Sequence, residues 1–376
     1  MNKRTFITTT ALSTLLASCS QLELNEGGSN EHRFSFVPSL VTETANRAID
    51  GTHSFGGKTY LAHNDFAVFA SGTEQDDFES CPSPSTWMYY TKIASNSGAW
   101  THTTDGEHEN EYYFDIWDTN GMHSFFAFSP YQAAMDANIS TAKGEAPAMN
   151  YAINPTDITA GYDLMYASAM NIEGNKYPDH YPQGNPFPAN GCVTMHFRHA
   201  LTQILVTFKV KNAEEFFASY PDEQATINSV GLSAMQTDGT LSFNPNGTAK
   251  WTLYDPTAAY EWAATNDNVL MARNAKTGAK PFPTTDGHVA LVMPQLLPNN
   301  TTLNFRYTYN GVSTDNSIAI NNVPYQSIPL TKFEMGKRYH FIVEFMPTGG
   351  ERPKLKTLIV ENWKAYNGAI NGTLEQ

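Results

Sequence analysis

The sequence predicts an all-β fold built from β-sandwiches, and three observations support this prediction. Aromatic residues make up 12% of the 376 residues and charged residues only 16%, a balance typical of β-rich exported or surface proteins. Apolar and polar residues alternate in short segments, as in half-buried strands. Asn, Gly and Pro separate these segments. The length fits two domains of about 150–200 residues each.

The net charge excludes two broad classes of function. The chain carries 23 basic and 37 acidic residues, a formal charge of −14. A nucleic-acid-binding protein needs a basic face, so nucleic acid is not an expected partner. A polybasic protein of the membrane surface is excluded for the same reason.

Residues 1–19 are predicted to be an export signal. Lys3 and Arg4 precede an apolar stretch that is shorter than the about 20 residues needed to span a bilayer. The segment ends in Leu16-Ala17-Ser18-Cys19, which resembles a bacterial lipobox. Several acyl chains on Cys19 would hold the protein stably on a membrane. The alternative is a plain signal peptide in which the cysteine occurs by chance. Residues 20–32 are polar and aperiodic, as in a flexible tether.

The strands are predicted from alternation with period two. The first is short and contains Phe34 and Phe36 on one face. The clearest cover residues 202–211, 303–309 and 339–345, and the second of these runs into Asn310-Gly311, a strong hairpin signal. Further strands are predicted over residues 67–71, 124–128, 227–232, 288–293 and 355–363. A single short helix is predicted over residues 213–218, with Asn212 as its cap.

A domain boundary is predicted where the pattern is weakest. Residues 171–190 are rich in Pro, Asn, Gly and Tyr, and they end just before a strongly apolar run. We therefore divide the mature chain into an N-terminal domain over residues 48–190 and a C-terminal domain over residues 191–376.

No group of residues indicates catalysis, a metal or a cofactor. The acidic run over residues 105–118 is consistent with a carboxylate cluster, but its spacing matches no known metal loop and a solvated loop is the simpler interpretation. His196 and His199 would lie on opposite faces of a strand, which favours structural roles over zinc binding. A disulfide between Cys81 and Cys192 is one alternative, and two buried thiols are the other. We expect no enzymatic activity.

Five strings, taken in order, resemble one protein family. They are Asp163-Leu164-Met165-Tyr166-Ala167, the segment from Met195 to Val206 that contains His199-Ala200-Leu201, Met293-Pro294-Gln295, the segment Gly336 to Phe341, and Ile359 to Trp363. With the lipobox, they resemble the fimbrillin family of Bacteroidales pilus subunits, and they span most of the chain.

This resemblance implies a fold and a mode of assembly. The fold would be two tandem transthyretin-like Greek-key β-sandwich domains. The chain would be exported as a lipoprotein precursor to the outer membrane, and an Arg-specific protease would remove an N-terminal propeptide that contains a strand. A strand from another subunit would fill the groove that remains, building a fimbria at the cell surface.

The resemblance also suggests which residues take part. Residues 20–47 would form the tether and the propeptide strand with Phe34 and Phe36, and Arg47-Ala48 would be the cleavage site, with Arg33 a poorer candidate. The candidate donor strand contains Leu355, Thr357, Ile359 and Trp363, followed by 13 further residues. The partners would be the same or related subunits, the membrane through the lipid, and an unidentified surface receptor.

One alternative function stays open. The chain could remain anchored in the outer membrane as a lipoprotein that binds surface glycans on an aromatic platform and does not polymerise.

Overall fold

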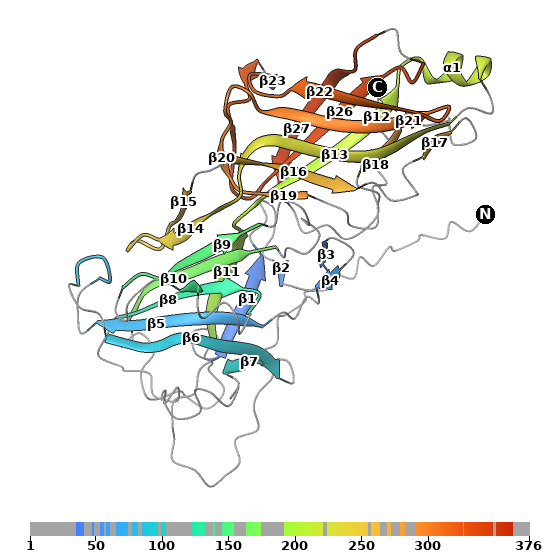
Figure 1. Ribbon diagram of the computed structural model, residues 1–376. Coiled ribbons are helices and arrows are strands. Elements are labelled where there is room, and N and C mark those ends of the chain that lie inside the picture. Colours follow the sequence, from blue (N-terminus) through green and yellow to red (C-terminus); the bar gives the residue numbers. More distant parts are fainter. Residues whose placement is uncertain are drawn as a thin grey trace, which may run out of the picture.

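The computed structural model describes residues 35–40, 47–48, 53–55, 58–60, 65–73, 77–81, 85–96, 99–102, 122–131, 138–139, 145–153, 163–173, 192–220, 224–254, 257–263, 269–271, 279–282, 290–325, 327–348 and 351–363. Two assemblies of β-sheet follow one another along the chain, and they occupy opposite halves of the molecule (Figure 1). The predicted all-β class, with two successive sheet assemblies, is confirmed.

The N-terminal assembly is one eight-stranded sheet. Its order is β11 (Cys192–His199), β10 (Met165–Glu173), β8 (Met122–Ser129), β5 (Phe66–Thr73), β6 (Ser85–Asn96), β7 (Ala99–His102), β1 (Ser35–Leu40) and β2 (Arg47–Ala48). Strand β1 also pairs with β11, so seven of these strands close into a ring. Apolar side chains of β1, β5, β6, β8, β10 and β11 fill the interior.

The C-terminal assembly is a sandwich of two sheets. The first contains β18 (Ala279–Phe282), β12 (Thr202–Val210), β26 (Lys337–Phe345) and β27 (Lys354–Asn362), with β19 (Ala290–Val292) also paired to β12. The second contains β16 (Thr257–Ala263), β13 (Gln224–Gln236), β21 (Thr302–Tyr309) and β22 (Val312–Ala319), with β17 (Val269–Met271) also paired to β13. Between the sheets, the rings of Phe208 and Phe305 are centred 4.8 Å apart.

Alternation explains why these segments form strands. In β12, Ile204, Val206, Phe208 and Val210 are all at most 1% exposed, whereas Lys209 faces solvent. In the hairpin of β21 and β22, Asn310 and Gly311 have φ of 49° and 75°, the left-handed pair that a two-residue turn requires. The predicted hairpin turn is therefore confirmed.

A small third sheet joins the two assemblies. It consists of β15 (Ala249–Leu253), β14 (Asp238–Phe243) and β9 (Ala148–Ala152), and it lies between the two larger bodies (Figure 1). From β14, Phe243 packs against Phe126 and Phe128 of β8, with ring centroids 5.0 and 5.3 Å apart. Strand β8 therefore buries its inner face in the ring and its outer face under this sheet.

The remaining elements are short. They are the strand pairs β3 (His53–Phe55) with β4 (Lys58–Tyr60), β20 (Gln295–Leu296) with β25 (Lys332–Phe333) and β23 (Pro324–Tyr325) with β24 (Ile328–Pro329), and the helix α1 (Ala213–Ser219). Helix α1 lies where it was predicted. Asn212 precedes it in a left-handed conformation with φ 48° and makes no side-chain cap, so the expected capping hydrogen bond is a wrong prediction. No helix in the described ranges is both long and apolar enough to cross a bilayer.

The chain passes from one assembly to the other at Ala200 and Leu201. The Ala200 N–H donates to the Leu164 carbonyl in the N-terminal half, at 2.8 Å. The Leu201 carbonyl accepts the Gly336 N–H from the C-terminal half, at 2.9 Å. Strand β11 pairs with β10 and β1, and its Val193, Met195 and Phe197 face the interior of the ring. It therefore belongs to the N-terminal assembly, whereas the predicted C-terminal domain, residues 191–376, includes it.

Candidate functional site

Strand β1 closes the ring of the N-terminal sheet. It runs parallel to β11 over six residue pairs, from Ser35 opposite Cys192 to Leu40 opposite Phe197. On its other side it pairs with β7 at Phe36 and with β2 at Ser39 and Leu40. We call the surface beneath and beside β1, formed by β7, β11 and the ring interior, the β1 seat.

Phe36 is the buried anchor of β1. Its side chain is 3% exposed, and it meets the rings of Phe66 and Phe125 edge-on, with centroids 5.9 and 5.8 Å away. Pro38, two residues on, is also buried. It falls between the pairings of β1 with β7 and with β2, a place where the missing N–H of proline is tolerated. The ring interior is therefore completed by side chains of β1.

The predicted cleavage site follows β1 closely. Arg47 and Ala48 form β2, the terminal strand of the sheet, and their only strand partner among the described residues is β1. The structure describes the backbone of these two residues and not their side chains. A cut between them would separate β1 from all later strands of the ring.

A second cluster lies where the two assemblies meet, and we call Asp163, His199, Gly336 and Trp363 the junction cluster. His199 Nδ1 and Asp163 Oδ2 are 2.7 Å apart, and both side chains are at most 10% exposed. The His199 ring stacks on Trp363, with centroids 3.9 Å apart and planes 12° apart.

Gly336 connects this cluster through the backbone. Its N–H donates to Leu201 and its carbonyl accepts the Trp363 N–H, at 2.9 and 2.8 Å. Its φ is +71°, in the left-handed region that favours glycine. Trp363 is only 7% exposed, so the end of β27 is fixed on the junction.

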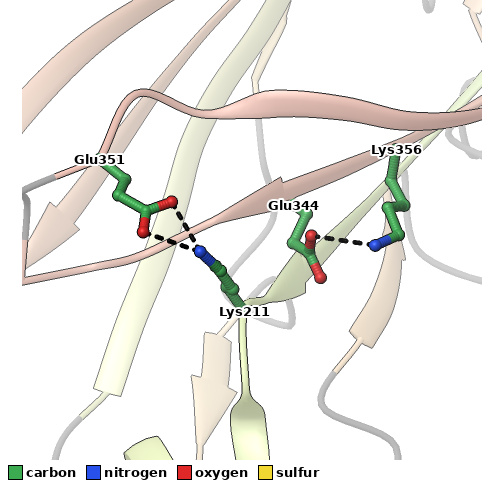
Figure 2. A network of polar contacts seen from close by, with 4 residues as sticks. All are labelled: Lys211, Glu344, Glu351 and Lys356. Atoms are coloured by element: carbon green, nitrogen blue, oxygen red, sulfur yellow. Dashed lines mark hydrogen bonds and ion pairs between the residues drawn. The ribbon is translucent and has the colours of Figure 1, made fainter.

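The start of β27 is held more loosely. Lys211 Nζ donates to both carboxylate oxygens of Glu351 at 2.7 Å, and Lys356 Nζ lies 3.5 Å from Glu344 Oε2 (Figure 2). The hydrogen bond between Lys211 and Glu351 raises the pKa of Lys211 and lowers that of Glu351. Glu351 and Lys356 are exposed and Lys211 and Glu344 are half-buried, and ion pairs this open to solvent contribute little to stability.

The candidate donor residues lie in and just after β27. This strand pairs with β26 from Lys337 opposite Asn362 to Glu344 opposite Lys354, with one register shift. Thr357 is exposed and Leu355 and Ile359 are half-buried, whereas Trp363 is buried. In this state the segment is the last strand of the C-terminal sandwich.

Several predicted residues lie outside the described residues. They are Cys19, the tether, Arg33, Phe34, the acidic run over residues 105–118, and the tail after Trp363. Cys81 is a free thiol, so the alternative of a Cys81–Cys192 disulfide is wrong. His196 and His199 lie on opposite faces of β11, since His199 is buried and His196 alternates with buried neighbours. The described part of the chain contains no group of His, Cys, Asp and Glu residues that would hold a metal.

Sequence reasoning missed two parts of this site. Asp163 and His199 occur in two of the strings that carry the resemblance, but their direct contact was not predicted. The parallel pairing of β1 with β11 was also missed. The alternation of Phe36 and Pro38 indicates a strand with one buried face, but not which strand it pairs with.

Comparison with known proteins identifies the family. The model of a family described as fimbrillin-like matches residues 47–363. This is a family of structural fimbrial subunits, so the prediction that the chain is not an enzyme is confirmed. No curated protein sequence matches the chain.

Solved structures of fimbrial proteins also match the chain. A fimbrial protein from Bacteroides vulgatus aligns with a TM-score of 0.54 and 15% identity, over 88% of this chain and 100% of that one. The tip fimbrial protein Mfa3 from Porphyromonas gingivalis, with a C-terminal truncation, aligns with a TM-score of 0.39 and 9% identity, over 83% and 98%. The first likeness supports the fold, and the family match extends from β2 to Trp363. The chain therefore belongs to the fimbrillin-like family, whose members are subunits of surface fimbriae that act in adhesion.

Proposed function

We propose that this chain is a fimbrial precursor that polymerises by exchange of a strand at the β1 seat. In this proposal, Cys19 is lipidated and carries the precursor to the outer membrane. Cleavage after Arg47 then releases the lipid, the tether and β1 together. A strand from another subunit takes the place of β1, and the head-to-tail contact builds a filament.

The burial of Phe36 directly upstream of Arg47 is the observation that carries the proposal. Phe36 fills the β1 seat in the intact precursor. Burying a phenylalanine side chain contributes about 1.5–3 kcal/mol to stability, which holds β1 in place. Without β1, the ring would expose Phe66 and Phe125 and an unpaired edge of β11 six residues long. An apolar groove beside a free edge is a strong template for an incoming strand.

The position of Arg47 supports cleavage as the trigger. Strand β2 is the last strand of its sheet and pairs only with β1 among the described strands. Loss of β1 therefore leaves β2 without its partner, and the cut removes little other structure. Because Leu40 pairs with Arg47, a cut after Arg47 would lie close to the end of the strand that must leave.

Two segments are candidates for the donor. If β27 is the donor, it must give up its pairing with β26 and the stacking of Trp363 on His199. If residues 364–376 are the donor, β27 and the junction cluster stay in place. We keep the segment predicted from the sequence, β27 with Leu355, Thr357, Ile359 and Trp363, as the candidate donor. Truncating the chain after Trp363 distinguishes it from residues 364–376.

The first experiment is limited digestion of the precursor with trypsin. We expect one early cut after Arg47, seen by intact mass, followed by filaments or ladders in electron microscopy. Arg47→Gln is the matched control and should stay uncut and monomeric. Early cutting elsewhere with Arg47 intact, or a cleaved protein that remains monomeric, contradicts the proposal.

A second variant addresses the donor. The chain truncated after Trp363 retains β27 but lacks the tail. Filaments from this truncated chain would assign the donor to β27, and their loss, with cleavage intact, would assign it to residues 364–376.

No observation favours the alternative of a glycan-binding lipoprotein. Among the described residues, the exposed large aromatic side chains are Tyr220 and Tyr254, at 43% and 41%. They lie after α1 and after β15, and two separate rings do not form a platform.

A further inference from the structure

Strand β22 is an exposed and regular sheet edge. It pairs with β21 alone among the described strands, over eight residue pairs from Tyr309 opposite Val312 to Thr302 opposite Ala319, without a register shift. Six of its eight residues are exposed and the other two are half-buried. Val312, at its start, is 66% exposed.

The other edge strands of the C-terminal sandwich carry features that discourage pairing. Strand β18 contains Lys280 and Pro281. Strand β27 contains two lysines and a register shift. Strand β16 is paired through a register shift and contains Glu261. Charge, proline and irregular register are the usual protections of a free edge. Strand β22 has no lysine, arginine, glutamate, proline or irregularity.

The one charge on β22 is paired within its own sheet. Asp315 accepts hydrogen bonds from Arg306 Nε and Nη2 of β21, at 2.7 and 3.1 Å. This pair crosses to the neighbouring strand of the same sheet, so it does not extend beyond the edge. The edge is therefore open to another strand without an unpaired charge.

We propose that β22 pairs antiparallel with β22 of a second copy of this chain. The twofold axis of such a pair is normal to the sheet, so one residue faces its own copy. Two registers pair seven residues. One places Asp315 opposite Asp315, and like charges directly opposite are destabilising. The other places Asn316 opposite Asn316 and is the register we assign.

The assigned register suits the side chains that meet. Asp315 faces Ser317 of the copy, which can donate a hydrogen bond to the carboxylate. Thr314 faces Ile318, a pair of β-branched residues that packs well across strands. The second sheets of the two copies then form one continuous sheet, in which β16, β13, β21 and β22 of one copy are followed by β22, β21, β13 and β16 of the other.

This contact is expected to be weak. A single pair of short strands buries less than the about 1,200 Å² of a small stable interface. The association should therefore depend on protein concentration. If the chain also forms filaments as proposed above, the same contact would repeat along neighbouring filaments and hold them together through multivalency.

The test compares two charges at one position. Ser317→Asp places an aspartate opposite Asp315 of the copy twice in each dimer, whereas Ser317→Lys places an opposite charge there. Sedimentation velocity over a concentration series is run on residues 20–376, which keep every described strand including β1, so strand exchange does not contribute. We expect the wild type to dimerise, Ser317→Asp to weaken dimerisation at least about tenfold, and Ser317→Lys to retain it.

A second readout locates the contact. Hydrogen exchange should slow in β22 as the wild-type concentration rises, and not in Ser317→Asp. Thermal unfolding checks that both variants are folded, as expected for an exposed site. A wild type that stays monomeric throughout the series, or a folded Ser317→Asp variant that dimerises like the wild type, overturns the proposal. Failure of this test leaves the digestion result at Arg47 unaffected.

Discussion

At the scale of single residues, the junction cluster shows how distant sequence strings act together. Asp163, His199, Gly336 and Trp363 belong to four strings that carry the resemblance, and the structure brings them within hydrogen-bonding or stacking distance. Each string alone is a weak signal. Their contacts give them a shared physical role, which is to fix the end of β27 against the link between the two assemblies.

Trp363→Ala should therefore destabilise the whole chain. Truncating a buried tryptophan typically costs about 3–5 kcal/mol, and here it also removes the ring stacked on His199. Trp363→Phe is the matched control, and its free energy of unfolding should fall markedly less, because it keeps an aromatic ring over His199. Urea unfolding measures both. Equal stability of the alanine variant and the wild type would mean that the end of β27 is not fixed in this way.

His340 should make stability depend on pH. Its Nε2 lies 2.6 Å from Thr207 Oγ1, and burial, with the nearby Arg338 charge, lowers its pKa from 6.5 to about 4, whereas Glu361 opposes the shift. The folded state thus keeps His340 neutral where the unfolded state binds a proton. Its contribution is fully present above pH 6.5 and is lost as the pH falls toward 4.

Protonation of His340 should lower the free energy of unfolding by on the order of 3 kcal/mol between these pH values. His340→Gln does not titrate and should flatten the stability of the chain over this window. Urea unfolding at several pH values compares the two proteins. If both lose the same stability between pH 6.5 and 4, His340 is not the titrating group.

At the scale of elements, β1 is the first strand of the chain, so its removal leaves all later strands on one continuous chain. Phe36→Ala should lower the stability of the precursor by about 3–5 kcal/mol, since the Phe36 ring packs on Phe66 and Phe125. After cleavage at Arg47 and release of the fragment, the variant and the wild type are the same molecule. Their unfolding curves should then coincide.

Thermal unfolding before and after digestion makes this comparison. A difference that persists after digestion would show that the cleaved fragment stays in the seat. In that case cleavage alone does not open the groove, and an incoming strand must displace β1.

The elements also show what sequence patterns can predict. Strands β12, β21 and β26 have one buried face, so alternation identifies them. In β5 and β8 nearly every residue is buried, so alternation is lost, and both strands extend beyond the predicted segments. Strand β14 was not among the predicted strands, although it alternates clearly, with Gly239, Leu241 and Phe243 buried.

Pairing between distant segments was beyond the reach of the sequence patterns. Nothing local in residues 35–40 indicates that they pair in parallel with residues 192–197. The same holds for β9 and β14 of the small third sheet, which pair although about 90 residues separate them along the chain. Such contacts depend on the packing of the whole chain, so the resemblance suggested a removable strand but not the geometry of its seat.

At the scale of the whole molecule, one of the two clusters of buried apolar residues spans both assemblies, whereas the other fills the ring of the N-terminal assembly alone. A single cluster of buried residues includes Phe126 of β8, Phe243 of β14 and Phe341 of β26. Trp251 Nε1 of β15 also donates to the Ala200 carbonyl at the link, at 2.7 Å. We therefore expect the halves to unfold together.

Phe243→Ala tests this coupling. Phe243 packs on Phe126, Phe128 and Tyr166 with centroids 5.0–5.9 Å away, so its loss should cost about 3–5 kcal/mol and fall mainly on the contact between the assemblies. Hydrogen exchange in urea, followed in β8 and in β26, reports each half separately. The wild type should show one shared midpoint, and the variant should show an earlier midpoint for β8. Separate midpoints in the wild type would mean that the halves are independent domains, and a filament of such subunits would bend at every link.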